Sequence, residues 1–496
     1  MATSAKRGAG VHRRSGRQRW AALRAGLLAV SLVAAAGTVG GGFRPAEATI
    51  ADSGGQWLWE GTARTVNNVR DDAGFGLLPA GLSLTGKGVG IALIDTGVAP
   101  VPGLTGGNVV NGPDLSFDSQ DPRKRYMDGY GHGTHLAGII SARTAKLTGL
   151  APDAKLTSIK VAAANGAVDV SQVIAAVDWV VEHRADDRKN PIRVLVLAYG
   201  TDSTQNYQVD PLSAAVENAW RAGITVVAAG GNNGNGARLL NPASDPFVLA
   251  VGGYDDRGTS TWADDRLADF TSVGGAGRRI DVVAPGRSIV SLRAPGSLLD
   301  AEYPQARLGA DYFVGSGSSQ AAAVTGAVVA DLLQAYPGLS PDQVKHLLYW
   351  SAFSLGPAAD KIWGVNIAQA WQNYRATPHR YSAVAARQRF TASTGRGSLE
   401  AARGSIHVAD GAAVLTGEND ILGPFSSTAW ARASAAGTAW DGGRWMGRDW
   451  TGEGWAAGPS GMSSWTGRAW SGRAWSGRAW SGQGWSSTTW QGGAWS

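Results

Sequence analysis

His132 lies between two glycines in the stretch MDGYGHGTHLAGIIS. An imidazole serves as a general base when it is both accessible and held still. Gly131 and Gly133 keep the surrounding backbone free of bulk, and the apolar run that follows predicts a buried helix to hold the ring. A structural histidine in a glycine-rich turn would show the same pattern. Metal binding through His132 and His135 is disfavoured, because Gly133 stands where the zinc-protease helix motif has a glutamate.

An aspartate follows the apolar run KGVGIALI and opens the tripeptide Asp95-Thr96-Gly97. The run predicts a buried strand that delivers the carboxylate at its C-terminal end, which is where sites form in open parallel sheets. The tripeptide would also fit a simple turn or one half of an aspartic protease. The protease needs a second copy to share a proton, and the sequence has no second Asp-Thr-Gly.

Two serines, Ser318 and Ser319, lie in GSGSSQ directly before the small-residue run 321–333. The run predicts a helix, so the hydroxyls would lie at a helix N-terminus, where a developing negative charge is stabilised. A nucleophile would benefit from this position, although helix capping alone would explain a serine here. Asn232, in AGGNNG, could donate its amide to an oxyanion or could belong to an ordinary turn.

The elements that must position these side chains alternate along the chain. Apolar runs without polar alternation predict buried strands at 87–94, 156–161, 193–198, 224–228, 247–251 and 280–283. Helical patterns separate or follow them at 171–184, 211–221, 321–333 and 340–350. Such strands favour a parallel sheet covered by helices on both faces. The sequence therefore predicts an α/β fold.

Taken together, the strand-end aspartate, the glycine-flanked histidine and the helix-opening serine follow the chain order Asp, His, Ser that characterises subtilisin. From residue 80 to about residue 375 the sequence resembles the subtilase (subtilisin-like) serine peptidases, particularly the exported actinobacterial kind. The matching motifs are GKGVGIALIDTGV, GHGTHLAGIIS, GLAPDAKL, VVAAGGNNG, VGSGSSQAAAV and YPGLSPDQVKHLL. The resemblance implies a three-layer α/β fold with a mostly parallel central sheet, and a serine endopeptidase that works through an acyl-enzyme.

Roles follow from the resemblance by position. It implies that Asp95 orients the imidazole, that His132 is general base and then general acid, and that Ser319 attacks the peptide carbonyl. Asn232 would supply the oxyanion-hole amide, together with the backbone N–H at the nucleophile.

The register of the nucleophile has one alternative. Counting back from Pro337 makes Ser319 the nucleophile and puts Ser318 in the place of the family's threonine. A shift by one residue would make Ser318 the nucleophile, but it would put Ser316 where the motif's opening glycine belongs. We prefer Ser319, because the opening glycine is needed for close backbone approach.

The resemblance also implies two backbone segments that pair with an extended peptide, so the expected partners are protein or peptide substrates. One segment is Ala198, Tyr199 and Gly200, and the other is Ala229, Gly230 and Gly231. We expect no required cofactor and assign no metal ligand. Structural calcium, which is common in the family, is left unassigned because no matching acidic loop is evident. We expect a monomer.

Four positions depart from the family pattern. Ser318 replaces threonine, Ala323 replaces proline, Ala327 replaces a helix glycine and Ala198 replaces a serine of the cleft. None of these changes removes a catalytic functional group, so activity is expected. Two alternatives remain: a pseudoprotease that acts through its tail, and an esterase or amidase that uses the same triad.

Charge and cysteine content limit other functions. Lys and Arg number 45 and Asp and Glu 39, but residues 1–48 alone hold eight basic side chains and one acidic one. The remainder has a net charge of −1, so nothing indicates a nucleic-acid partner. The absence of cysteine from all 496 residues excludes disulfides and thiolate metal sites.

The N-terminal region predicts export. Residues 1–48 combine a basic start, a short apolar stretch and Ala46-Glu47-Ala48, which is typical of a cleavable signal; a membrane anchor is the alternative. We therefore expect a secreted or cell-surface, extracellular protein. The predicted order is an export signal (1–48), a short extension (49–80), the peptidase domain (81–375), a linker (376–425) and a repeat tail (426–496).

Tryptophan recurs in the tail with a period of five, at residues 430, 440, 445, 450, 455, 465, 470, 475, 480, 485, 490 and 495. This period matches neither a helix nor a strand. Exposed indoles at regular spacing would suit stacking on cell-wall polysaccharide, with nearby arginines for cation–π contacts. A low-complexity extension with no binding role is the alternative.

Overall fold

The computed structural model describes residues 51–53, 56–58, 64–259, 262–355, 363–410 and 413–450. The predicted export signal and the repeat tryptophans from Trp455 onward lie outside the described residues. Within the described residues, no helix is long and apolar enough to cross a membrane.

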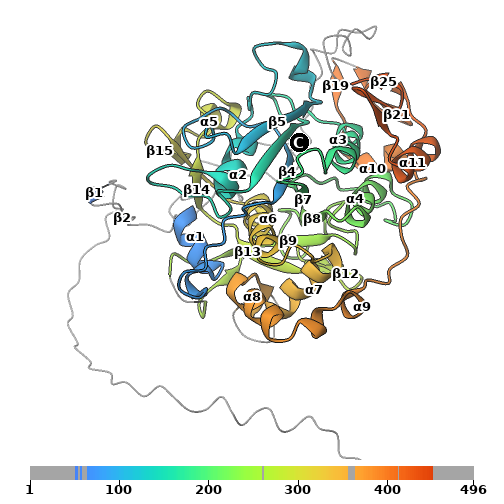
Figure 1. Ribbon diagram of the computed structural model, residues 1–496. Coiled ribbons are helices and arrows are strands. Elements are labelled where there is room, and N and C mark those ends of the chain that lie inside the picture. Colours follow the sequence, from blue (N-terminus) through green and yellow to red (C-terminus); the bar gives the residue numbers. More distant parts are fainter. Residues whose placement is uncertain are drawn as a thin grey trace, which may run out of the picture. The chain divides into compact units, whose positions relative to one another are not determined.

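A ten-stranded sheet forms the centre of the fold (Figure 1), in the order β17-β18-β13-β9-β8-β7-β4-β6-β5 with β10 paired to β9. Every pairing from β18 to β5 is parallel, whereas β17 and β10 are antiparallel additions. The strands are β4 (Gly90–Asp95), β5 (Val109–Asp114), β6 (Lys155–Lys160), β7 (Ile192–Leu197), β8 (Thr225–Ala229), β9 (Leu249–Asp255), β10 (Arg266–Leu267), β13 (Val282–Pro285), β17 (Phe353–Ser354) and β18 (Trp363–Gly364). The predicted α/β fold with a mostly parallel central sheet is confirmed.

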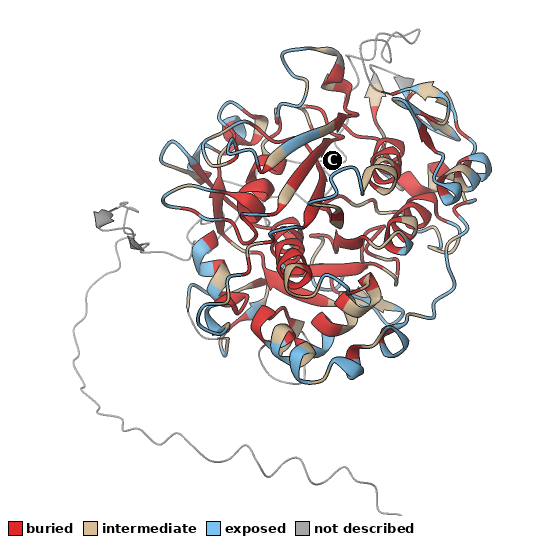
Figure 2. Ribbon diagram, viewed as in Figure 1, coloured by how far each residue is buried: buried red, intermediate tan, exposed pale blue. Residues whose placement is uncertain are grey.

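Both faces of this sheet are covered, which explains the uninterrupted apolar runs. Along β4, Ala92 and Ile94 point into one hydrophobic cluster while Ile91 and Leu93 point into the other. Figure 2 shows the central strands as almost wholly buried. Successive side chains of a strand alternate between faces, so burial on both sides removes the polar positions of a half-exposed strand.

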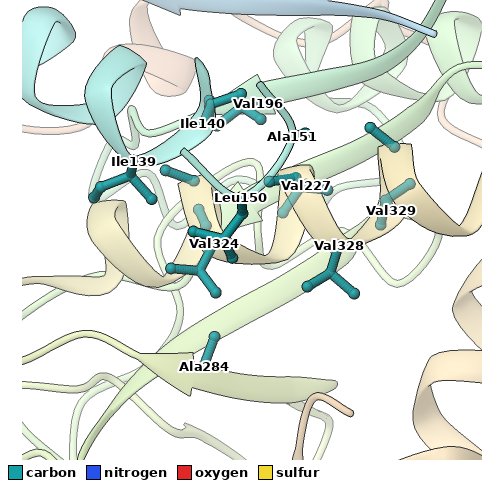
Figure 3. Close-up of a cluster of buried hydrophobic side chains, with 14 of the residues drawn as sticks. Ile139, Ile140, Leu150, Ala151, Val196, Val227, Ala284, Val324, Val328 and Val329 are labelled. Atoms are coloured by element: carbon teal, nitrogen blue, oxygen red, sulfur yellow. The ribbon is translucent and has the colours of Figure 1, made fainter. Parts of the chain in front are cut away.

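Helices form the two outer layers. α3 (Val170–His183) and α4 (Pro211–Arg221) pack on one face of the sheet. On the other face lie α2 (His132–Ser141), α6 (Ser318–Ala335) and α7 (Pro341–Ser351), with α8 (Ile367–Ala376) beside them. Figure 3 shows Val324 and Val328 of α6 in one buried cluster with Ile139 of α2 and Val227 of β8.

Local sequence signals set several helix starts. Asp169 caps α3 through a capping box with Gln172, and Ser340 caps α7 through a capping box with Gln343. These side chains bond N–H groups that the first helical turn leaves without partners. Pro341 occupies the first turn of α7, where a missing N–H costs nothing.

A smaller sheet, in the order β15-β16-β14-β3, leads into α6. Its strands are β3 (Arg64–Thr65), β14 (Ile289–Leu292), β15 (Arg307–Leu308) and β16 (Tyr312–Gly315). The remaining elements before residue 390 are β1 (Ala51–Ser53), β2 (Gln56–Leu58), α1 (Val66–Asp72), β11 (Gly274–Gly275), β12 (Arg278–Arg279), α5 (Leu298–Glu302) and α9 (Ala383–Ala386). β16 ends two residues before Gly317, the residue that precedes α6, so this sheet sets where α6 begins.

The C-terminal elements pack against α3 and α4 on one face of the fold. They are α10 (Leu399–Arg403), β19 (Ala409–Asp410), β20 (Ala413–Val414), β21 (Asn419–Asp420), β22 (Gly423–Pro424), α11 (Ser427–Ala436), β23 (Trp440–Asp441), β24 (Arg444–Trp445) and β25 (Arg448–Asp449). Leu399, Phe425 and Trp430 belong to the same hydrophobic cluster as α3. In the described part of the chain, the core therefore extends to Trp450.

The period of five has a structural explanation in β23 to β25. Each strand has two residues and pairs antiparallel with the next, so that Trp440 faces Trp445 across the ladder. A two-residue strand and the short turn after it place each following tryptophan on the same face of this three-stranded sheet. The Trp445 and Trp450 rings lie 4.9 Å apart between centroids in an edge-to-face arrangement.

The expectation of exposed indoles is wrong for the first four repeat tryptophans. Trp430, Trp445 and Trp450 are fully buried and Trp440 is 6% exposed. A buried indole needs a partner for its N–H. Trp430 and Trp445 both donate to Asp178 of α3, at 2.7 and 2.9 Å, and Trp440 donates to the Ala175 carbonyl at 2.8 Å.

Candidate active site

Asp95 and His132 form a buried pair at the carboxyl edge of the sheet. Asp95 is the last residue of β4, which lies between β6 and β7 in the sheet. The chain passes from β4 to β5 on one side of the sheet and from the neighbouring β7 to β8 on the other side, which makes the end of β4 a switch point. Ligands bind at such switch points in open α/β sheets. His132 Nδ1 lies 2.7 and 2.9 Å from the two Asp95 carboxylate oxygens, and both side chains are at most 1% exposed. This contact favours the tautomer with its proton on Nδ1, which makes Nε2 the basic nitrogen.

Asp128 fixes the surroundings of this pair, a role that the motif search missed. Its carboxylate accepts from the Thr96 hydroxyl at 2.8 Å, the Gly131 N–H at 2.6 Å, the Thr134 N–H at 2.8 Å and the Thr134 hydroxyl at 2.6 Å. The donors come from the end of β4 and from both sides of His132. Burial raises the pKa of Asp128, while these hydrogen bonds act in the opposite direction. The aspartate in DGYGHGTH, four residues before the histidine, was the available sequence signal.

His135 lies one helical turn after His132 but has a packing role. Its Nε2 lies 3.2 Å from the carbonyl oxygens of both Ile289 and Phe313. Burial, followed by the charge on His132, lowers the pKa of His135 to about 3, so the ring is neutral near pH 7. Among the described residues, no group of three His, Asp or Glu side chains is arranged to hold a metal ion.

Ser318 and Ser319 begin α6 and have different surroundings. The Ser318 hydroxyl accepts from the Gly231 N–H at 3.2 Å, and its own N–H donates to Asn232 Oδ1 at 2.8 Å. Ser319 is the second residue of the helix, is 5% exposed and has no side-chain hydrogen bond to another described residue. Its hydroxyl is therefore not committed to a structural partner. Catalytic hydrogen bonds often close only when substrate is bound.

The helices that carry His132 and Ser319 converge behind the site. α2 packs against α6, and a Cβ at Gly315 would lie 2.9 Å from both Gln320 Nε2 and His135 Cε1. Gln320, next to Ser319, is fully buried, and its amide has no hydrogen-bond partner among the described residues. A glutamine after a serine carries no distinctive sequence signal, so the burial of Gln320 is visible only in the structure.

Asn232 lies in the loop after β8 and points to the start of α6. Because its Oδ1 accepts from Ser318, its Nδ2 is directed toward Gly317, where a Cβ would lie 3.1 Å from that nitrogen. A Cβ here would also lie 2.9 Å from Gln320 Oε1, so glycine suits this close approach. The side-chain amide and the N–H groups of the first turn of α6 thus lie together at a helix N-terminus.

The two segments expected to bind substrate differ in their backbone bonding. Ala198, Tyr199 and Gly200 follow β7, and Gly200 is half-buried. In the second segment, the Gly230 N–H donates to Val251 and the Gly230 carbonyl accepts from Leu240. The Gly231 N–H donates to Ser318 and its carbonyl accepts from Ser272. Peptide pairing along this second segment would have to displace these bonds, so it is better suited to line a pocket than to pair.

Leu240 fills the space between the two segments. A Cβ at Gly200 would lie 2.7 Å from Leu240 Cβ, and a Cβ at Gly231 would lie 2.8 Å from Leu240 Cγ. The same residue therefore touches both walls, and its side chain is mostly buried. Leu240 has no sequence signature of its own, because its contact with the first segment joins residues 40 positions apart in the chain.

A buried Asp–His pair lies at the edge of a parallel sheet, and the helix that begins at His132 packs against the helix whose first turn holds Ser319. This is the arrangement expected of an α/β serine hydrolase. Residues 86–393 match the model of the subtilase family. The chain belongs to this family of serine peptidases.

Similar curated proteins include the serine protease AprX of Bacillus subtilis (strain 168), 37% identical over 278 residues that cover 54% of this chain and 62% of AprX. Subtilisin Savinase of Lederbergia lenta is 32% identical over 289 residues, which cover 58% of this chain and 91% of that protein. A crystal structure of a cold adapted subtilisin-like serine proteinase aligns with a TM-score of 0.42 and 29% identity, over 55% of this chain and 85% of that one. The chain spans 62% of AprX and 40% of the minor extracellular protease Epr of Bacillus subtilis (strain 168), less than two thirds of either.

Proposed function

We propose that this chain is a serine endopeptidase that hydrolyses peptide bonds through Asp95, His132 and Ser319. The observation that carries the proposal is the buried Asp95–His132 contact at 2.7 Å, at the sheet edge where β4 ends. Such a pair has the geometry of a general base and its orienting carboxylate. Protein or peptide substrates are the corresponding partners.

In the proposed acylation step, the Ser319 oxygen bonds to the substrate carbonyl carbon while its proton passes to His132 Nε2. The carbonyl oxygen takes up the negative charge of the tetrahedral intermediate. The carbon–nitrogen bond then breaks, and the proton on His132 passes to the leaving amine. A water molecule repeats the sequence on the acyl-enzyme and releases the acid. Asp95 stabilises the imidazolium at both stages.

Oxyanion stabilisation is assigned to the Asn232 Nδ2 amide and the Ser319 N–H. The bond from Ser318 N–H to Asn232 Oδ1 supports this assignment, since it fixes the amide before substrate arrives. Ser319 is preferred over Ser318 as the nucleophile, because the Ser318 hydroxyl and N–H are both bonded to the loop after β8.

The test is labelling of the purified protein with a fluorophosphonate probe, followed by mass mapping of the modified peptide. We expect an adduct on Ser319 that Ser318→Ala retains and that Ser319→Ala and His132→Ala lose. In subtilisin, loss of the equivalent Ser or His lowers turnover about a millionfold, and we expect a similar loss of casein hydrolysis. An unlabelled but folded wild-type protein would refute the proposal, and hydrolysis of small esters without casein would indicate the esterase alternative.

The location and the tail also belong to this proposal. We propose a secreted or cell-surface protein, on the basis of the basic and apolar leader in residues 1–48. The exported actinobacterial type is proposed from the resemblance of the motifs alone. For polysaccharide binding, only the repeat tryptophans from Trp455 onward remain candidates, since the four before them are buried. Pull-down of the chain on insoluble cell-wall material tests that role.

A further inference from the structure

The C-terminal part of the chain lies directly behind the substrate segment that follows β7. The Thr201 hydroxyl, next to Gly200, donates to the Ala402 carbonyl of α10 at 2.7 Å, and both residues are fully buried. On the other side, the Thr201 backbone pairs with Asn241. A segment that binds substrate through its backbone must itself be held in place. Here the outer support comes from α10, 201 residues further along the chain.

Arg403 anchors α10 through a buried ion pair. Its Nε lies 2.6 Å from Asp169 Oδ2, and both side chains are 0% exposed. The other guanidinium nitrogens reach the Gly417 carbonyl at 2.7 Å, the Glu400 carboxylate at 3.0 Å and the Asn419 carbonyl. A planar guanidinium can satisfy this many acceptors at once, which an ammonium cannot. The pair therefore fixes α10 to the N-terminus of α3 in one geometry.

Asp169 connects the Arg403 ion pair to the segment that precedes His132. It caps α3 and ends the loop 163–168, and Gly166 in this loop lies against Tyr130. A Cβ at Gly166 would lie 2.9 Å from the Tyr130 ring, two residues before His132. Arg403 thus contacts an aspartate whose loop packs beside the histidine segment.

A second contact ties α10 to the continuation of the substrate segment. The Ser405 N–H donates to Asp202 Oδ1 at 2.7 Å, and a Cβ at Gly404 would lie 2.2 Å from the same carboxylate. Gly404 also has a positive φ of 65°, which favours glycine. The turn after α10 is therefore shaped to fit against Asp202.

We propose that Arg403 is a positioning residue for the substrate cleft, which holds the segment Ala198–Thr201 in its binding geometry through Asp169 and α10. This inference rests on the proposed function. The C-terminal region would then be a part of the peptidase that shapes substrate binding. The side chains of Asp95, His132 and Ser319 lie on β4, α2 and α6, and none of the hydrogen-bond partners of Arg403 among the described residues, namely Asp169, Glu400, Gly417 and Asn419, lies on these elements. Disturbing Arg403 should therefore weaken the binding of long substrates and leave bond cleavage largely intact.

The experiment compares Arg403→Met and Thr201→Val with the matched control Arg448→Met in the full chain. Arg448 also pairs with a buried carboxylate of the C-terminal region, Asp420 at 2.8 Å, but has no contact with residues 198–203 among its hydrogen bonds. The readouts are KM and kcat on a quenched-fluorescence peptide of about ten residues, and the rate of fluorophosphonate labelling.

For Arg403→Met we expect KM to rise about tenfold while kcat changes less than about twofold, the signature of lost uniform binding. Thr201→Val should raise KM by a smaller factor, and Arg448→Met should leave it unchanged. If Arg403→Met fails to fold, the KM of Thr201→Val tests the inference instead, because this change removes only the hydroxyl that bonds α10.

Two results would overturn the inference: unchanged KM in both test variants, or equal rises of KM in Arg403→Met and Arg448→Met. A fall in kcat and labelling with unchanged KM would also contradict it, since that pattern places the defect in the triad. Failure of the proposed function has a different signature, namely no labelling of the wild-type protein.

Discussion

The indole N–H of Trp430 donates to the carboxylate of Asp178 at 2.7 Å, across 252 residues of sequence. Trp445 donates to the same oxygen of Asp178, and the Ser434 hydroxyl bonds the other oxygen. The carboxylate of one α3 residue therefore gathers three donors from the C-terminal region. The first part of the tryptophan repeat is thus an integral element of the folded protein.

Trp445→Ala tests this integration. Removing a fully buried indole should lower the free energy of unfolding by about 3–5 kcal/mol, since it leaves a cavity beside Trp450 and Phe425. Trp350, which is 64% exposed, is the matched control, and Trp350→Ala should change stability by less than about 0.5 kcal/mol. Urea unfolding followed by far-UV circular dichroism measures both. Equal effects of the two changes would contradict the buried packing.

Asn232→Ala addresses the oxyanion assignment. Loss of one preorganised donor should reduce kcat roughly a hundred- to a thousandfold, with a much smaller change in KM. The neighbouring Asn233, whose N–H donates to Ser272, provides the control, and Asn233→Ala should retain nearly full kcat. Steady-state kinetics on a chromogenic peptide distinguishes them. An Asn232→Ala variant as fast as wild type would remove this residue from the mechanism.

Asp128→Asn should loosen the segment that holds His132. An amide places an NH₂ group against N–H donors, so at least one buried group loses its acceptor, at about 1–3 kcal/mol. The rate of fluorophosphonate labelling should fall roughly ten- to a hundredfold, because the reacting groups are no longer held in alignment. Asp121, which pairs with Arg123 on the surface of the same loop, is the control. Comparable labelling rates in Asp128→Asn and Asp121→Asn would show that Asp128 does not position the histidine.

The lowered pKa of His135 predicts that the protein loses stability in acid. Its pKa in the folded protein is lowered to about 3, below the ordinary value of 6.5, so the unfolded state binds more protons between these values. The contribution of neutral His135 to the free energy of unfolding is complete above pH 6.5. It is lost as the pH falls toward 3, at about 1.4 kcal/mol per pH unit. In His135→Gln, which cannot titrate, the free energy of unfolding should fall less steeply from pH 6.5 to 4.5. Parallel pH profiles for the two proteins would rule out this titration.

Leu240→Ala should widen the pocket between the two substrate segments. Leu240 contacts both Gly200 and Gly231, so in the wild type we expect a preference for small side chains next to the scissile bond. The variant should raise kcat/KM for a bulky side chain by about tenfold or more relative to alanine. Leu156→Ala removes the same atoms from a buried residue of β6, which pairs with β4 and β5 and with neither substrate segment, and the preference of this variant should not change. A preference unaltered by Leu240→Ala would mean that this side chain does not limit the pocket.

Much of the central fold could be predicted from the sequence, because its signals are local. The strand run before Asp95 was predicted at 87–94 and observed as β4 at Gly90–Asp95, and the helix predicted at 211–221 has the bounds of α4. Continuous apolar runs and residues such as Ser340 and Pro341 act over one or two turns of chain. The Asp95 and His132 motifs could be found for the same reason, since glycines and strand ends mark them within a few residues.

What only the tertiary structure decided are the contacts between segments far apart in the chain. Asp128 could be seen as a residue near His132, but not as the acceptor of five donors from the end of β4 and the start of α2. The ion pair of Arg403 with Asp169 and the position of Leu240 have no local signature at all. The repeat of five residues was visible in the sequence, yet its burial depended on whether α3 offered acceptors for the indoles. A sequence pattern reports the periodicity of one segment, whereas burial is decided by which other segment covers it.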